Sequence, residues 1–197
     1  MSHSSKPVFA DDWYENRRLR LLAQEAGSGR ILDVGYAHLP NSYFTGDHVT
    51  GIDLEPPTSA VPYDETIVGD AASLGALWGR RFDSVVVGEL IEHLEDPYGF
   101  LRGVRDLLDP GGRLVLSTPN PVSFPVVMAE WMRTRSRFYA ADHTFYFPPR
   151  WVDRMLENCG FRVIRERAVG LWLPPLRIPL CPIGLSYQVV YVAEPVD

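Results

Sequence analysis

The stretch Ile31-Leu32-Asp33-Val34-Gly35 decides the fold, together with Gly51-Ile52-Asp53-Leu54 a short distance along the chain. Both are short apolar runs that end in a carboxylate or a glycine, which is typical of buried parallel strands. Open α/β sheets bind their ligands outside the carboxyl ends of such strands. An acidic side chain at the end of the second strand can accept hydrogen bonds from both hydroxyls of a ribose. The two stretches therefore predict an α/β fold that binds a cofactor with a nucleoside part.

Outward from these stretches, apolar runs alternate with helical patterns along the chain. Strands are expected at 30–35, 48–53, 66–69, 82–87, 113–117, 161–168 and 187–193. Helices are expected at 12–26, 41–44, 71–77, from Asp96-Pro97, within 122–134 and from Pro149 to Cys159-Gly160. In the fourth of these, Asp96 is a good cap and Pro97 a good first helical residue. The alternation predicts one doubly wound α/β domain over residues 1–197, with 1–10 as a flexible tail.

Composition and charge narrow the class of protein. A chain of 197 residues can bury the core of one α/β domain. Its net charge of -6 lacks the excess of positive charge that is typical of proteins that bind nucleic acid. Two cysteines are too few for a disulfide framework, and no CxxC spacing suggests zinc. No signal peptide and no run of about 18 apolar residues is found, so we expect a cytoplasmic protein without a membrane span.

Five motifs follow one another in the chain: Ile31-Leu32-Asp33-Val34-Gly35, Gly51-Ile52-Asp53-Leu54, Gly69-Asp70-Ala71, Phe82-Asp83-Ser84-Val85-Val86-Val87 and Asp109-Pro110-Gly111-Gly112-Arg113-Leu114-Val115-Leu116. In this order the motifs resemble the class I S-adenosylmethionine-dependent methyltransferases, in particular the small type-11 and ubiquinone-pathway-like groups. The resemblance covers residues 12–193. It implies a Rossmann-like, mostly parallel, seven-stranded sheet whose last strand is antiparallel, and S-adenosylmethionine as the cofactor.

The resemblance also implies where the cofactor binds. Gly35 lets the backbone approach the cofactor because it has no Cβ. The ribose is expected at Asp53 and Leu54, the adenine at Asp70 and Ala71, and the methionine part at Glu89 and Leu90. A helix cap or turn role is the second interpretation of Asp53. For Asp33 the sequence leaves open whether the carboxylate contacts the cofactor or ties the loop together.

The loop after the first strand departs from the family pattern. The family has Gly-x-Gly-x-Gly there, whereas this chain has Gly35-Tyr36-Ala37-His38-Leu39-Pro40-Asn41. Ala37 adds one methyl group at the second glycine position, and Leu39 with Pro40 requires a reshaped loop. Because Asp53 and Asp70 are retained, we interpret the loop as a working variant that binds the cofactor with Tyr36 and Ala37.

The first helix offers two further cofactor residues, Tyr14 and Arg17. In similar methyltransferases this helix covers the cofactor, and an arginine can pair with its carboxylate, a bidentate task that suits a guanidinium. The alternative is a solvated basic face without ligand contact.

Two histidines are the candidate catalytic residues: His93 follows the strand expected at 82–87, and His143 lies in the loop before the helix expected from Pro149. Loops at the carboxyl ends of strands form the substrate side of this fold. Either imidazole could remove a proton from an attacking hydroxyl or amine. The alternative for each is a structural hydrogen bond. A metal site at Asp142 and His143 would need a distant carboxylate that no pattern identifies, so we predict no metal ligands.

Segments 120–150 and 170–186 are rich in aromatic and apolar residues. They are expected to form a lid over the substrate side, a pocket for an aromatic or apolar small-molecule acceptor, or the interface of a homodimer.

The resemblance to the methyltransferases implies transfer of a methyl group from S-adenosylmethionine to an oxygen or nitrogen of a small molecule. A non-catalytic binding subunit is the first alternative, motivated by the altered loop and the apolar segment 170–186. An NAD-dependent oxidoreductase is the second, although that class has Gly-x-Gly-x-x-Gly at the start of a helix and this chain does not.

Overall fold

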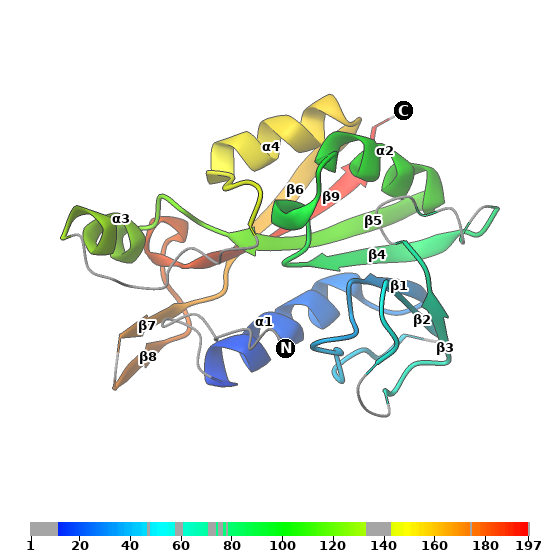
Figure 1. Ribbon diagram of the computed structural model, residues 1–197, viewed down its shortest axis with the longest axis horizontal. Helices are drawn as coiled ribbons and strands as arrows, with labels where there is room; N and C mark the ends of the chain where they lie inside the picture. The colour runs from blue at the N-terminus through cyan, green and yellow to red at the C-terminus, as the bar shows by residue number, and fades with distance from the viewer. Residues whose placement is uncertain are drawn as a thin grey trace.

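The protein is described by a computed structural model that covers residues 12–46, 48–57, 61–70, 74, 77, 79–132, 143–173 and 175–196 (Figure 1). Its helices are α1 (Asp12–Ala26), α2 (Pro97–Leu107), α3 (Phe124–Trp131), α4 (Pro149–Asn158) and the short 3₁₀ turns η2 (Ile91–His93) and η3 (Ile183–Leu185). Its strands are β1 (Arg30–Val34), β2 (His48–Asp53), β3 (Glu65–Val68), β4 (Phe82–Gly88), β5 (Leu108–Pro119), β6 (Phe161–Ala168), β7 (Leu171–Leu173), β8 (Leu176–Ile178) and β9 (Gln188–Pro195).

Seven of the strands form one sheet in the order β3-β2-β1-β4-β5-β9-β6. β1 to β5 pair in parallel. β9, the last strand of the chain, lies antiparallel between β5 and β6. This arrangement confirms the mostly parallel seven-stranded sheet with an antiparallel last strand.

Helices cover both faces of the sheet, with α1 on one side and α2 and α4 on the other (Figure 1). Strand β4 shows the consequence for the sequence. Val85 and Val87 pack on the side of α2 and α4, while Val86 packs on the side of α1. A strand covered on both faces needs apolar side chains in both directions, so β4 is a continuous apolar run.

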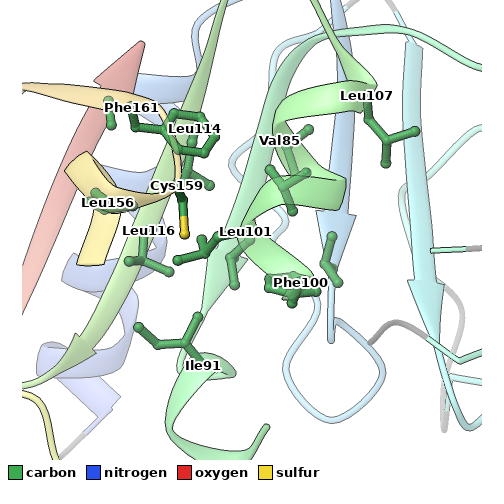
Figure 2. Packing of buried hydrophobic residues seen from close by; sticks show 14 of the residues in the cluster. Val85, Ile91, Phe100, Leu101, Leu107, Leu114, Leu116, Leu156, Cys159 and Phe161 are labelled. Atoms are coloured by element: carbon green, nitrogen blue, oxygen red, sulfur yellow. The ribbon is translucent and has the colours of Figure 1, made fainter. Parts of the chain in front are cut away.

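The larger of the two cores lies beneath α2 and α4. Figure 2 shows Phe100 and Leu101 of α2 directed at the sheet, where Val85 and Leu116 lie. The helix starts as expected, because the Asp96 carboxylate accepts a hydrogen bond from the Gly99 amide at 2.8 Å.

Two local predictions were wrong. The helix expected at 41–44 is a turn, in which the Asn41 side chain accepts a hydrogen bond from the Tyr43 amide at 3.0 Å. Asparagine favours such turns because its side chain can replace a backbone acceptor. The strand expected to begin at Arg113 begins at Leu108, so the Gly111-Gly112 pair lies inside β5.

The two apolar segments lie on the same side of the molecule. α3 and the β7–β8 hairpin both extend beyond the carboxyl end of β5 (Figure 1). The hairpin was not predicted, because its strands are only three residues long. Lid and interface roles for these segments stay predictions. The expected tail 1–10, the helix at 71–77 apart from residues 74 and 77, and the part of 120–150 at 133–142 lie outside the described residues.

None of the helices in the described part of the chain has the length and apolar character needed to span a lipid bilayer.

Candidate cofactor and acceptor site

The carboxyl ends of the central strands meet at one edge of the sheet and are tied to one another by main-chain hydrogen bonds. The Gly35 amide donates to Ile52 at 2.9 Å, and the Gly69 amide donates to Asp53 at 2.8 Å. On the other side, the Glu89 amide donates to Ser117 at 3.0 Å. The predicted cofactor residues that follow β1, β2, β3 and β4 therefore lie along one edge, as their positions after parallel strands require.

Gly35 and Leu90, two of these residues, face each other. Gly35 has a φ of +79°, a left-handed conformation that glycine adopts without strain. A Cβ on Gly35 would lie 3.4 Å from the Leu90 side chain. The glycine thus turns the chain sharply out of β1, and the Leu90 side chain lies against the place that a Cβ would take.

Asp53 anchors the altered loop. One carboxylate oxygen accepts a hydrogen bond from the Ala37 amide at 2.8 Å, and the other accepts from the Glu55 amide at 3.3 Å. The structure therefore shows the turn role that was the second interpretation of Asp53, and it brings Asp53 and Ala37 together. Leu54 follows and is 67% exposed. Ribose binding by Asp53 and Leu54 stays a prediction.

Asp33 lies behind the loop. Its side chain is buried and accepts a hydrogen bond of 2.6 Å from the Tyr63 hydroxyl. Burial raises the pKa of Asp33 to about 7, although the Tyr63 hydrogen bond and the nearby Arg18 guanidinium oppose this shift. These contacts favour the structural interpretation of Asp33. Tyr63 was missed because it lies 30 residues from its partner, in a connection without a recognisable motif.

The raised pKa of Asp33 predicts that the protein becomes less stable as the pH rises. The folded state holds the Asp33 proton more tightly than the unfolded chain, so the free energy of unfolding falls between pH 3.8 and about 7. Buried Glu89, whose pKa is also raised to about 7, acts in the same direction. Asp33→Asn keeps an acceptor for Tyr63 and removes the titration. Urea unfolding at about pH 5 and about pH 8 should show a smaller difference for this variant than for the unaltered protein. Equal differences would contradict the assignment.

Tyr36 packs into the protein interior. Its ring lies 5.1 Å from that of Tyr63, centroid to centroid, and only 1% of the residue is exposed. Gly51 of β2 makes room for both rings, since a Cβ there would lie 2.7 Å from Tyr36 and 2.8 Å from Tyr63. Any cofactor contact of Tyr36 therefore has to come from its main chain, and it stays a prediction.

Asp70 is exposed directly after β3, next to the Gly69 amide that binds Asp53. Adenine binding by Asp70 stays a prediction. Ala71, the other residue expected there, lies outside the described residues.

The two α1 residues expected at the cofactor bind protein groups. The buried Tyr14 hydroxyl lies 3.2 Å from Ser186 Oγ and accepts a hydrogen bond from the Gln188 amide at 3.0 Å. The Arg17 guanidinium donates to the carbonyls of Val169 at 2.5 Å and Pro179 at 2.6 Å. These contacts favour a role in holding the segment after β6, rather than a pairing of Arg17 with a cofactor carboxylate.

Glu89 is fastened to two neighbouring strands. Its backbone has a φ of +55°, which is unusual for a residue with a side chain. The carboxylate accepts hydrogen bonds from Ser117 Oγ at 3.0 Å and from Gln188 Nε2 at 2.6 Å. Burial raises its pKa to about 7. Ser117 and Gln188 were not predicted, because their place beside Glu89 follows only from the order of the strands. The expected contact of Glu89 with the methionine part stays a prediction.

The two candidate catalytic histidines meet. The rings of His93 and His143 are nearly perpendicular, with centroids 4.6 Å apart. The main-chain carbonyl of Glu92 accepts hydrogen bonds from the Thr144 amide at 2.8 Å and the Phe145 amide at 3.0 Å, which brings His143 beside η2. Sequence reasoning named both histidines but could not show that they are neighbours.

Glu92 completes this cluster. The residue is 1% exposed, one carboxylate oxygen accepts a hydrogen bond from Thr118 Oγ1 at 3.2 Å, and burial raises its pKa well above the ordinary range. Ligand atoms of Glu92, His93 and His143 all lie within 4.8 Å of one another. The carboxylate that a metal site at His143 would need is therefore Glu92, a residue not expected in that role. Asp142 lies outside the described residues.

Comparisons with known proteins agree with this geometry. A family model described as "Methyltransferase domain" matches residues 10–166. The ubiquinone biosynthesis O-methyltransferase of Xanthomonas axonopodis pv. citri (strain 306) is 30% identical over 191 residues, which cover 89% of this chain and 76% of that protein. The protein of the same name from Aeromonas salmonicida (strain A449) is 28% identical, with 98% of this chain and 84% of that protein covered.

Solved structures share the fold at lower identity. The 1,6-didemethyltoxoflavin-N1-methyltransferase of Burkholderia thailandensis, solved with 1,6-didemethyltoxoflavin and S-adenosylhomocysteine bound, superimposes with a TM-score of 0.66. It is 18% identical, and the match covers 94% of this chain and 80% of that one. A SAM-dependent methyltransferase from Archaeoglobus fulgidus also has a TM-score of 0.66, at 16% identity over 90% of this chain and 91% of that one.

Proposed function

The chain belongs to the methyltransferase-domain family and is an S-adenosylmethionine-dependent methyltransferase; from this premise we propose that it methylates a hydroxyl oxygen of a small molecule. The observation that carries the choice of oxygen is the cluster of Glu92, His93 and His143 after β4. A hydroxyl has to lose its proton to become a good nucleophile, and this cluster offers two imidazoles to take it. Two relatives in sequence, the ubiquinone biosynthesis O-methyltransferases of Xanthomonas axonopodis pv. citri and Aeromonas salmonicida, support the same choice.

The residues at the carboxyl edge fit the cofactor. Gly35 turns the chain sharply out of β1 and presents no Cβ to the cofactor. Asp53 supplies carboxylate oxygens for the ribose hydroxyls, and exposed Leu54 follows it at the same strand end. S-adenosylmethionine, when bound, supplies a methyl group that its sulfonium already activates, so the protein mainly has to align the acceptor and receive its proton.

Removal of the Asp53 carboxylate should weaken cofactor binding. Asp53→Ala is expected to reduce the binding free energy of S-adenosylmethionine by about 1–3 kcal/mol, because the ribose hydroxyls and the Ala37 amide lose their acceptor. Isothermal titration calorimetry measures the change. Asp83→Ala is a matched control, since Asp83 accepts a hydrogen bond from the Arg30 amide at 2.7 Å at the opposite end of the sheet. If both variants bind the cofactor equally well, Asp53 does not hold it.

The function itself is tested in two steps. Calorimetric titration with S-adenosylmethionine and S-adenosylhomocysteine, with NAD as the control, is expected to show micromolar binding of the first two only. Release of S-adenosylhomocysteine is then measured with a panel of hydroxylated aromatic compounds and a panel of the corresponding amines. Turnover of the amines alone would contradict the assignment to oxygen. A folded protein that binds no cofactor would favour the non-catalytic alternative.

A further inference from the structure

The loop that replaces the family's glycines is held in place from outside the loop. Its first part is tied to β2, because Asp53 accepts the hydrogen bond of the Ala37 amide. Its last part is tied to the β2–β3 connection, because the Asn41 amide donates to the Tyr63 hydroxyl at 2.7 Å. The Asn41 side chain, which is buried, also donates to the Leu19 carbonyl at 2.9 Å. A loop without flexible glycines thus takes its shape from side chains of neighbouring elements.

Tyr63 is itself fixed on three sides. The next residue, Asp64, is clamped to β2: the Asp64 amide donates to the Val49 carbonyl at 2.9 Å, and the Val49 amide donates to the Asp64 carboxylate at 2.7 Å. The Tyr63 ring packs between those of Tyr36 and Phe44, with centroids 5.1 and 6.1 Å away. The clamp and the ring contacts leave the hydroxyl in one place, between Asp33 and the Asn41 amide.

We propose that Tyr63 is a positioning residue for the cofactor: its hydroxyl bridges the Asp33 carboxylate and the Asn41 amide, and this bridge gives the loop the shape that binds S-adenosylmethionine. The hydroxyl donates to Asp33 at 2.6 Å and accepts from Asn41 at 2.7 Å, so it forms one short link from the end of β1 to the end of the loop. The inference rests on the proposed function, because it takes the cofactor to lie against Gly35 and Asp53.

The experiment compares Tyr63→Phe with Tyr43→Phe. The first variant keeps the packed ring and removes only the bridging hydroxyl. The second removes a hydroxyl from the β1–β2 connection, one that donates to Asn16 Oδ1 at 2.9 Å on the exposed side. Calorimetry with S-adenosylhomocysteine should give a Kd about tenfold higher for Tyr63→Phe, the usual loss for one buried hydrogen bond, and an unchanged Kd for Tyr43→Phe.

Two further readouts separate positioning from general stability. In steady-state assays Tyr63→Phe should raise the KM for S-adenosylmethionine and leave kcat and the KM for the acceptor unchanged. The pH at which the Kd changes as Asp33 titrates should also be higher in Tyr63→Phe than in the unaltered protein. The reason is that the pKa of Asp33 rises when the Tyr63 hydrogen bond is lost. Arg18 of α1, which lowers that pKa, and Asp53 of β2, which raises it, remain in place.

The outcomes are distinct. A Tyr63→Phe protein with an unaltered Kd, KM and pH profile overturns the proposal, even if its melting temperature is lower, because the hydroxyl then only stabilises the fold. An equal loss of affinity in Tyr43→Phe overturns it as well. Failure of the unaltered protein to bind S-adenosylhomocysteine would overturn the proposed function and this inference with it, whereas binding that is insensitive to Tyr63 would leave the proposed function in place.

Discussion

Replacing His143 by alanine lowers kcat for methyl transfer by about 10²–10⁴-fold, which is the usual contribution of a positioned acid–base group. His143 lies against His93, and hydrogen bonds from Thr144 and Phe145 to Glu92 hold its segment in place. Those hydrogen bonds use main-chain atoms, so the substitution leaves them intact. The Kd for S-adenosylmethionine should stay the same, because the proposed cofactor contacts at Gly35 and Asp53 belong to other loops. Release of S-adenosylhomocysteine at saturating cofactor measures the effect.

His48 supplies the matched control. Its side chain is 44% exposed at the start of β2, beside Asp64 and Glu65, and thus at the opposite end of that strand from the site. His48→Ala should leave kcat unchanged. A His143→Ala enzyme with full kcat would show that the histidine cluster takes no part in the reaction.

The same assay distinguishes the two ways in which the cluster could receive the proton. If His143 acts as the base alone, a chelator should leave the activity of the unaltered enzyme unchanged. If Glu92, His93 and His143 hold a divalent cation, a chelator should abolish activity and added Mg²⁺ or Mn²⁺ should restore it, since their ligand atoms are close enough to share one ion.

Replacing Leu101 by alanine lowers the free energy of unfolding by about 2–5 kcal/mol. Leu101 is fully buried in the centre of α2 and faces Val85 and Leu116 of the sheet (Figure 2). Truncation removes apolar contacts and leaves a cavity between two elements that cannot collapse freely. Urea unfolding should show a lower midpoint with an unchanged m-value.

Leu173 is the control for this second substitution. It lies in the β7–β8 hairpin with 45% of its side chain exposed. Leu173→Ala should change the free energy of unfolding by less than about 0.5 kcal/mol, as is usual at exposed sites. A similar loss in both variants would mean that the contacts of α2 with the sheet do not dominate the stability.

Most strands could be predicted because a local run of residues, and the residues that end it, indicate each of them. Strands were expected at 82–87 and 161–168. The structure has β4 at Phe82–Gly88 and β6 at Phe161–Ala168. The start of α2 could also be predicted, because Asp96 caps the first turn of the helix and Pro97 is its first residue. Where the chain makes short elements, as at Asn41 and in the β7–β8 hairpin, too few residues repeat for a period to be recognised.

Only part of the candidate site could be predicted from the sequence. Gly35, Asp53 and Asp70 could be placed because each ends a strand, and position at a strand end is a property of the local sequence. The partners of these residues could not be inferred in the same way. Tyr14 and Arg17 were expected at the cofactor, yet they bind Gln188 and Val169, more than 150 residues along the chain.

The sequence by itself thus determined the order of the strands along the chain, the class of fold, and the edge of the sheet at which the cofactor is expected, because apolar runs and the residues that end them act over a few positions. Only the tertiary structure decided which side chains meet at that edge. The contacts of Tyr63 with Asp33 and of Glu92 with Thr118 join segments 30 and 26 residues apart. Such contacts depend on the lateral order of the strands and the direction of each side chain, which are settled when the two faces of the sheet are packed and which no local pattern specifies.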